Sequence, residues 1–276
     1  MTSEAIDGAL ASLSALLQVA GSCAVAVSGG VDSVTLATVA QRALDRRAQM
    51  FHAVSPAVPR EATARVRREA ERQGWRLEVI DAGEFGDAAY RANPSNRCFF
   101  CKSNLYGAIA QRTPELIVSG TNLDDLGDVR PGLKAAESHG VRHPFVEAGI
   151  DKAGVRRIAR QLGLGDIAEL PSSPCLSSRI ETGLRIEPAM LALVHEVEAI
   201  VGSALPAGTV RCRVRRDALV IELDAGVLGT LGASQRDALS AEIAARMAHY
   251  AVERPISFAA YRRGSAFLDG RPRASP

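Results

Sequence analysis

Cys98 and Cys101 form a C-x-x-C pair within the segment NRCFFCK, in a chain that contains only five cysteines. This spacing fits a redox dithiol, half of a zinc site, part of an iron–sulfur cluster, or packing in a core. A zinc site needs four ligands, and the one additional histidine pair, His139 and His143, is interpreted as having surface or core roles. The C-x-x-C pair alone therefore does not decide among these kinds of site.

The other three cysteines divide into two groups. Cys23 and Cys212 lie in predicted strands, and we interpret both as buried structural thiols. Cys175 instead lies in PSSPCLSSR, a stretch rich in Pro and Ser that has no periodicity and is predicted to be a loop. Three loop cysteines can hold a 4Fe–4S cluster by three irons and leave the fourth iron open for an exogenous sulfide. Cys98, Cys101 and Cys175 are therefore candidate metal ligands and catalytic residues.

The segment SGGVDS, residues 28–33, follows a short apolar run and precedes a predicted helix. Gly29 and Gly30 permit backbone torsions that other residues avoid, and they let the main chain approach a ligand closely. The helix N-terminus offers free N–H groups, and the hydroxyl groups of Ser28 and Ser33 add donors. Asp32 could cap the helix or help to hold Mg²⁺. The segment predicts an anion-binding loop, and an ordinary strand-to-helix turn is the simpler alternative.

Neither of two common nucleotide-binding patterns explains this loop. No Gly-Lys-Ser/Thr follows it, so it is not a Walker P-loop, and its glycines do not have dinucleotide-binding spacing. One G-x-G-x-x-A does occur at residues 163–168, but it follows a predicted helix instead of a strand. The type of ligand that SGGVDS binds therefore remains open at the level of these patterns.

A second polar loop, within IVSGTNLDDLGDVRPG, also follows a predicted strand. The carboxyl ends of parallel strands meet at one edge of a sheet, so Gly120, Thr121 and Asn122 can face SGGVDS and contribute to the same site. Asp125 could hold Mg²⁺ on a pyrophosphate, and Arg130 could neutralise a bound anion. The simpler alternative is a capped, solvated loop.

Hydrophobic periodicity supplies the elements that would position these residues. Alternating strands and helices predict right-handed βαβ units and a parallel sheet covered on both faces, followed by a small α+β unit. The predicted domains are residues 1–170, a cysteine-containing junction loop over 171–186, and residues 187–276. The predicted strands cover residues 23–27, 50–54, 77–80, 116–119, 210–215, 219–223 and 256–261, and the predicted helices cover 33–46, 60–73, 99–111, 152–162, 187–201 and 235–250.

Length and composition restrict the class of protein. The chain has 276 residues, of which 47% are hydrophobic and 23% charged, which is typical of a globular protein. Its 33 Lys and Arg nearly balance 31 Asp and Glu, so nothing global favours nucleic acid. Glu4 and Asp7 stand where a secretory leader would be basic, and no apolar run reaches the ~20 residues that span a bilayer. We expect a cytoplasmic protein with reduced thiols and no membrane partner.

SGGVDS resembles the PP-loop of the ATP pyrophosphatases, which bind ATP and activate a substrate as its adenylate. Over nearly its full length the chain resembles one PP-loop family, LarE, the ATP-dependent sulfur transferases of nickel-pincer cofactor synthesis. The resemblance rests on VAVSGGVDS, NPSNRCFFCK, SGTNLDDLGDVRPGL, PSSPCLSSRI and VRCRVR, in this order. It implies ATP and Mg²⁺ as cofactors, a pyridinium dicarboxylate mononucleotide as substrate, and two conversions of carboxylate to thiocarboxylate.

The family resemblance implies two possible sources of sulfur. In one mechanism, the cysteine at the position of Cys175 gives up its own sulfur and becomes dehydroalanine. In the other, that cysteine and the C-x-x-C pair hold a 4Fe–4S cluster that delivers sulfide and can be recharged. Because Cys98, Cys101 and Cys175 are all present, we favour the cluster mechanism.

The strand predicted over residues 210–215 carries three arginines with period two. Arg211, Arg213 and Arg215 would share one face at about 7 Å spacing, and the simple interpretation is a solvated strand face. The resemblance implies that Arg211 and Arg213, with Glu198, form a phosphate or metal site, which could lie between subunits because the family forms homo-oligomers. Arg179 is a candidate for binding a substrate carboxylate or phosphate.

Three other functions remain as alternatives. A tRNA thiolation enzyme also pairs an adenylating loop with three cysteines, but the nearly neutral charge and the family-specific loops argue against nucleic acid as a partner. An amide-forming PP-loop ligase would leave the cysteines without a role. A non-enzymatic nucleotide sensor would not turn over ATP.

Overall fold

The chain forms two compact units in a computed structural model that describes residues 3–127, 131–206 and 208–267, with side chains described from residue 7. The first unit combines Met1–Asp87 with Asn96–Ser173, and the second combines Ala88–Ser95 with Pro174–Pro276. The short segment Ala88–Ser95 therefore belongs to the unit that is formed mainly by the C-terminal part of the chain, a division that no periodicity in the sequence indicates.

The first unit contains a four-stranded sheet with the strand order β3-β2-β1-β4, and all of its strand pairs are parallel. This arrangement confirms the predicted parallel α/β fold. The elements of this unit are α1 (Ser3–Ala20), β1 (Cys23–Ala26), α2 (Val31–Leu44), η1 (Asp45–Arg47), β2 (Ala48–Ala53), α3 (Arg60–Gln73), β3 (Arg76–Ile80), η2 (Glu84–Gly86), α5 (Arg97–Ala110), β4 (Ile117–Ser119), η3 (Leu123–Gly127), α6 (Pro131–Ser138), α7 (Pro144–Glu147), α8 (Lys152–Gln161) and α9 (Gly165–Ala168).

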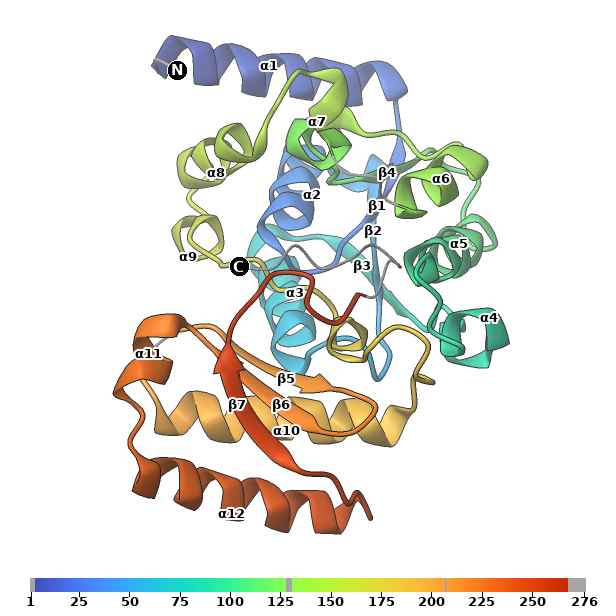
Figure 1. Ribbon diagram of the computed structural model, residues 1–276. Helices are drawn as coiled ribbons and strands as arrows, with labels where there is room; N and C mark the ends of the chain where they lie inside the picture. Colours follow the sequence, from blue (N-terminus) through green and yellow to red (C-terminus); the bar gives the residue numbers. More distant parts are fainter. Residues whose placement is uncertain (1–2, 128–130, 207, 268–276) are drawn as a thin grey trace. The chain divides into compact units, whose positions relative to one another are not determined.

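The strand β1 is completely buried because both faces of the sheet are covered. Its alternate residues enter two different cores. Cys23 and Val25 pack with residues of α1, α2 and α8, whereas Ala24 and Ala26 pack with residues of α5 and α6. Figure 1 shows α2 and α5 on either side of the strands. The apolar run CAVA is thus explained by burial on both faces, and the loop after β1 lies at the carboxyl edge of the sheet.

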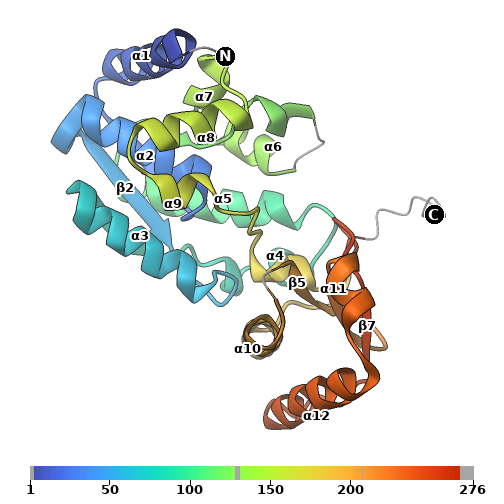
Figure 2. The ribbon, with the colours of Figure 1, turned by 90° about the vertical axis from the view of Figure 1, so that its left-hand side faces the viewer.

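The second unit is built on a three-stranded sheet with the order β5-β6-β7, in which β5 and β6 are antiparallel and β6 and β7 are parallel. The helices α10 and α12 pack together beside it (Figure 2). This mixed sheet with helices confirms the predicted small α+β unit. Its elements are α4 (Ala88–Arg91), η4 (Leu176–Arg179), α10 (Pro188–Ala204), β5 (Val210–Val214), β6 (Leu219–Leu223), α11 (Ala225–Thr230), α12 (Ala233–His249) and β7 (Ile256–Ala260).

Hydrogen bonds explain why Ala88–Ser95 belongs to the second unit. The hydroxyl groups of Tyr90 and Ser177 lie 2.7 Å apart, and the side-chain amide of Asn93 donates to the carbonyl of Glu181 at 2.9 Å. The backbone N–H of Ile186 donates to the carbonyl of Arg91 at 2.9 Å. Tyr90 and Asn93 are buried, so this segment is part of the core of the second unit.

Among the described residues, no helix is both long and apolar enough to cross a membrane. Cys23 and Cys212 are fully buried, which confirms their prediction as structural thiols. Burial raises the pKa of the Cys23 thiol to about 12, with a smaller contribution from Glu115, so this thiol stays protonated and unreactive at neutral pH.

Candidate active site

The loop between β1 and α2 is held by hydroxyl groups from its two ends. The Ser33 hydroxyl donates to the carbonyl of Gly30 at 3.1 Å, and its oxygen accepts from the backbone N–H of Ser28 at 3.1 Å. The hydroxyl groups of Ser28 and Ser33 also lie 3.1 Å apart. Within the described part of the chain, no side chain caps α2 at Gly30. The first N–H groups of α2 are therefore oriented as they are in anion-binding helix termini.

Two glycines are required here for steric reasons. Gly29 has φ +86°, and a Cβ atom on it would lie 2.8 Å from the carbonyl oxygen of Ala62 in α3. A Cβ atom on Gly120 would lie 2.9 Å from the backbone carbonyl carbon of Asp32 and 2.9 Å from the backbone nitrogen of Ser33. Gly120 thus lets the loop after β4 pack directly on the first turn of α2. The sequence predicted that these two loops face each other, and the structure brings them together in this way.

Asp32 lies in the first turn of α2 and makes contacts with two other loops. One carboxylate oxygen pairs with Nζ of Lys152 at 2.5 Å, and the other accepts from the side-chain amide of Asn122 at 3.1 Å. Lys152 is the first residue of α8, which is capped by the Asp151 side chain through the N–H of Gly154 at 2.6 Å. The cap fixes where α8 begins and so places Lys152 beside Asp32. Sequence reasoning missed Lys152, since the two residues are 120 positions apart.

The loop after β4 has its own set of hydrogen bonds. The N–H of Asn122 donates to the carboxylate of Asp125 at 3.1 Å. The Ser119 hydroxyl lies 3.2 Å from that of Thr121 and 2.9 Å from Nδ1 of His143. Burial lowers the pKa of His143, which favours its neutral form at neutral pH. His143, interpreted from the sequence as a surface or core residue, therefore belongs to this loop network. Arg130 was also predicted to bind an anion and lies outside the described residues.

Two further residues that the sequence analysis missed contact the glycine loop. Nη1 of Arg65 donates to the carbonyl of Gly29 at 2.8 Å, and burial lowers the pKa of its guanidinium. The ring of His52 lies 2.8 Å from the carbonyl of Val27 through Nδ1 and 2.9 Å from the Thr63 hydroxyl through Nε2. These contacts come from α3 and β2, so periodicity alone could not assign them to the loop.

The C-x-x-C pair lies at the beginning of α5. Cys98 is exposed and Cys101 is half-buried, and both are free thiols. Residues three positions apart on a helix lie on the same face, with Cβ atoms about 5–6 Å apart. The two thiols can therefore act as neighbouring ligands or as a dithiol.

In the second unit, Cys175 precedes a short buried turn. Cys175 is exposed, whereas Leu176–Arg179 form η4 and are buried. The prediction of an irregular loop was wrong for these four residues because their side chains enter the core of this unit. Arg179 is 2% exposed and forms a two-fold ion pair with Glu198, through Nε to Oε1 and Nη2 to Oε2, each at 2.9 Å.

The arginines of β5 have different environments. Arg213 is 4% exposed, so the interpretation of a solvated strand face was wrong at this residue. Its Nε donates to Glu222 at 2.8 Å, because the neighbouring strand β6 supplies a buried carboxylate. Arg211 is half-buried, with its guanidinium 5.9 Å from the centroid of the Tyr261 ring. Burial and the positive charge of Arg179 lower the pKa of Arg211. The structure thus places Arg179, Arg211, Arg213 and Glu198 in one unit, where much of this charge is paired internally.

No group of three His, Cys, Asp or Glu side chains is arranged as metal ligands among the described residues. Cys98 and Cys101 belong to the first unit and Cys175 to the second, and each unit is described separately. The three-cysteine site therefore stays a prediction.

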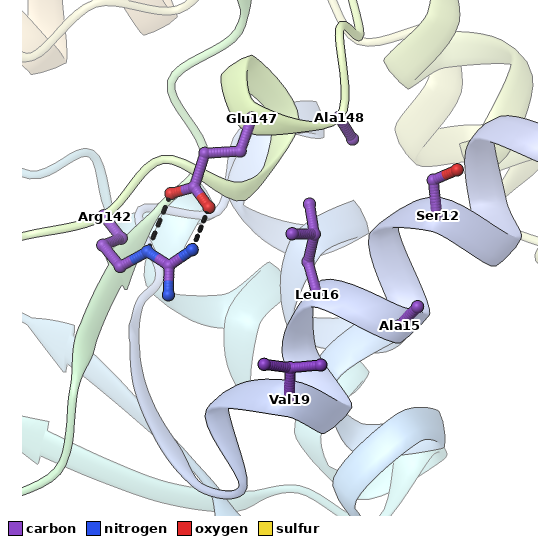
Figure 3. A pocket seen from close by; sticks show the side chains of 7 residues that line it. All are labelled: Ser12, Ala15, Leu16, Val19, Arg142, Glu147 and Ala148. Carbon is purple, nitrogen blue, oxygen red and sulfur yellow. Dashed lines mark hydrogen bonds and ion pairs between the residues drawn. The ribbon is translucent and has the colours of Figure 1, made fainter.

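A pocket of about 420 Å³ in the first unit is lined by none of the predicted site residues (Figure 3). It lies between α1 and the segment around α7, and Nε of Arg142 donates to Glu147 at 3.0 Å on one of its walls. The opposite wall is apolar and includes Leu16 and the exposed Val19. Its lining shares no residue with the loops around Asp32.

No protein-family model matches the chain. The chain is 37% identical over 203 residues to the uncharacterized protein slr1717 of Synechocystis sp., covering 72% of this chain and 75% of that protein. It is 29% identical over 210 residues to the pyridinium-3,5-bisthiocarboxylic acid mononucleotide synthase of Lactiplantibacillus plantarum, covering 74% and 75% of the two chains. The uncharacterized protein MJ0830 of Methanocaldococcus jannaschii is 26% identical over 204 residues.

A parallel sheet with a glycine turn between β1 and α2, followed by a small α+β unit, defines the fold of the PP-loop ATP pyrophosphatases. Within this class, the chain belongs to the LarE family.

Proposed function

We propose that this protein is an ATP-dependent sulfur transferase of nickel-pincer cofactor biosynthesis. Its substrate would be pyridinium-3,5-biscarboxylic acid mononucleotide, whose carboxylate it adenylates and converts to a thiocarboxylate. The observation that carries the proposal is the similarity to the Lactiplantibacillus plantarum synthase over 74% of the chain. The uncapped N-terminus of α2 supports it, because ATP phosphates need such donors.

In the first step, a substrate carboxylate oxygen attacks the α-phosphorus of ATP. The bond from that phosphorus to the bridging oxygen breaks, and pyrophosphate leaves with the electron pair. The N–H groups at the start of α2 and the Ser28 and Ser33 hydroxyls would hold the phosphates, with Gly120, Thr121 and Asn122 on the opposite loop. Asp32 and Asp125 provide carboxylate oxygens of the kind that Mg²⁺ prefers, and Mg²⁺ would neutralise phosphate charge.

In the second step, a sulfur nucleophile attacks the carbonyl carbon of the adenylate, a C–S bond forms, and AMP leaves. A 4Fe–4S cluster would supply a renewable sulfide, and Cys98, Cys101 and Cys175 are the thiols that would hold it. Two of these thiols share one face of α5, and all three are free and at least partly accessible, which fits a ligand role. Arg130 and Arg211 are the arginines that we propose to bind substrate anions.

The alternative source of sulfur is Cys175 itself. Its thiolate would attack the adenylate to form a thioester and release AMP. Loss of the Cys175 α-proton to a base and cleavage of its Cβ–S bond would then leave dehydroalanine on the protein and a thiocarboxylate on the product. This mechanism allows a single sulfur transfer for each protein molecule.

The iron and acid-labile sulfide contents of anaerobically prepared protein, together with thiocarboxylate formation, test the proposal. The cluster mechanism requires that Cys98→Ser, Cys101→Ser and Cys175→Ser each lose iron and sulfur transfer, whereas Cys23→Ala, in buried β1, should retain both. If Cys175 is sacrificial, the intact mass after turnover should fall by one sulfur, and Cys98→Ser should stay active. Absence of substrate-dependent ATP–pyrophosphate exchange would contradict adenylation itself.

Two partner expectations accompany the proposal. The family resemblance implies a homo-oligomer, which light scattering of the purified protein can measure. Tight, salt-sensitive binding of bulk tRNA in a gel shift would instead support a tRNA thiolation enzyme.

A further inference from the structure

We infer that Arg179 is a positioning residue for Cys175, fixing the backbone of the cysteine segment instead of binding a substrate anion. The inference rests on the proposed function only for the chemical role of Cys175. The contacts that carry it all lie within the second unit.

Arg179 donates to the backbone on both sides of the Cys175 side chain. Its Nη1 lies 2.7 Å from the carbonyl oxygen of Pro174 and 3.2 Å from that of Cys175. The same nitrogen also lies 3.0 Å from the Ser178 hydroxyl. Hydrogen bonds from a charged donor are stronger than neutral ones, so these carbonyls are held firmly. One guanidinium nitrogen thus fixes the two peptide planes that orient the Cys175 side chain.

The rest of the Arg179 guanidinium is engaged by Glu198. Both carboxylate oxygens of Glu198 accept from it, and Oε1 also accepts from the backbone N–H of Cys212 at 2.9 Å. The side chains of Arg179 and Glu198 are 3% and 14% exposed. An incoming substrate carboxylate would have to displace a buried, bidentate partner, which is strongly unfavourable. Glu198 is therefore the anchor that orients the guanidinium toward the cysteine segment.

Further contacts fasten the turn that follows Cys175. The N–H of Ser178 donates to the carbonyl of Cys175 at 3.0 Å, and Nη1 of Arg213 donates to the carbonyl of Ser178 at 3.0 Å. The hydroxyl of Ser177 lies 2.7 Å from that of Tyr90. The exposed Cys175 thus precedes a turn that is fixed on its buried side. Such support matters because misplacement of a reacting group by about 1 Å can cost about 100-fold in rate.

The test compares Arg179→Lys and Glu198→Gln with Arg185→Lys in the full-length protein. Arg185 makes a matched control, since it pairs with Glu187 at 2.7 Å in the same unit but is 57% exposed. Lysine keeps the positive charge but cannot contact Glu198 and two carbonyls together. We expect hydrogen exchange of the Ser178 amide to become at least tenfold faster in Arg179→Lys and Glu198→Gln, and to be unchanged in Arg185→Lys.

A kinetic comparison separates positioning from substrate binding. In the Arg179 and Glu198 variants, we expect thiocarboxylate formation to fall about 100-fold. The KM for the dicarboxylate in ATP–pyrophosphate exchange should stay within twofold, because adenylation precedes the step that uses Cys175. A tenfold or larger rise in this KM with unchanged Ser178 exchange would overturn the inference and assign Arg179 to the substrate.

The exchange measurement also separates failure of the inference from failure of the proposed function. If the wild-type protein forms no thiocarboxylate, the proposed function is wrong, but faster Ser178 exchange in the variants would still support the positioning role. If Arg179→Lys does not fold, Glu198→Gln gives the same readout, because it weakens the anchor while keeping a neutral hydrogen-bonding side chain. Unchanged exchange in that variant would contradict the inference.

Discussion

Lys152 and Asp32 form an ion pair of 2.5 Å that joins the start of α8 to the start of α2. The pair compensates an acidic side chain at the place where the proposed phosphates would bind. Its two side chains are 36% and 26% exposed, so solvent weakens the pair and its contribution to stability is small, at most about 1 kcal/mol. Its importance would lie in orienting Asp32.

Lys152→Gln should therefore separate stability from nucleotide chemistry. We expect the free energy of unfolding to change by less than about 1 kcal/mol, whereas ATP–pyrophosphate exchange falls at least tenfold because Asp32 loses its orientation. Urea denaturation and the exchange assay measure the two effects. Lys134→Gln, at an exposed site on α6, is the matched control and should change neither quantity. Equal exchange rates in the two variants would show that the pair has no role in the reaction.

Gly120→Ala should disturb the contact between the β4 loop and α2. The added Cβ atom would lie 2.9 Å from backbone atoms, which cannot yield as a flexible side chain does. We expect a loss of about 1–3 kcal/mol in the free energy of unfolding, measured from the urea midpoint. Gly165→Ala in α9 is a suitable comparison, since a Cβ atom added there would have no neighbour within 4 Å, and its stability should be unchanged or slightly higher.

His52 should make the protein less stable in mild acid. Burial lowers its pKa below 6.5 in the folded state, so the unfolded chain takes up the proton first as the pH falls. The stability contribution of neutral His52 is present above about pH 6.5 and is lost progressively below it. Thermal unfolding between pH 7.5 and 5.5 should therefore show a shallower pH dependence in His52→Gln than in the wild type. His249→Gln, on the exposed end of α12, should keep the wild-type slope.

Arg213→Met should be strongly destabilising because it leaves Glu222 buried with its closest partner removed. The two side chains are 5% and 3% exposed and lie 2.8 Å apart. Loss of one member of a buried pair costs about 3–5 kcal/mol, and the lower end is expected here because Arg215 stays within 3.6 Å of Glu222. Chemical denaturation gives the value. The double variant Arg213→Met, Glu222→Leu should recover much of the loss, and a failure to recover would point to a different cause.

The fold was predictable from local patterns to a large extent. Buried runs such as CAVA predict strands of a two-sided parallel sheet, and the helices around Arg60 and Lys152 begin where they were expected. The segment Ala88–Ser95 was not predictable, because Tyr90 and Asn93 are buried by residues about 87 positions away. Periodicity reports which face of an element is buried but not which distant segment covers it.

The candidate site was predictable where a motif is contiguous. SGGVDS indicates the turn and the open helix N-terminus, but the partners Lys152 and Arg65 come from other helices. The alternation of arginines on β5 was visible, yet their charge partners were not, because Glu222 acts through strand pairing. Charges that look available for a ligand in a sequence can be paired inside the protein, as Arg179 is.

The insertion of Ala88–Ser95 into the second unit has a consequence for how this chain can be divided and exchanged. A fragment that starts at Pro174 lacks α4 and so lacks the hydroxyl and amide groups that bind Ser177 and Glu181. The C-terminal region is therefore not a self-contained cassette that could be transplanted between proteins by a single recombination event. During synthesis, the short segment made early must wait for partners made roughly ninety residues later, which links the completion of this unit to the later part of translation.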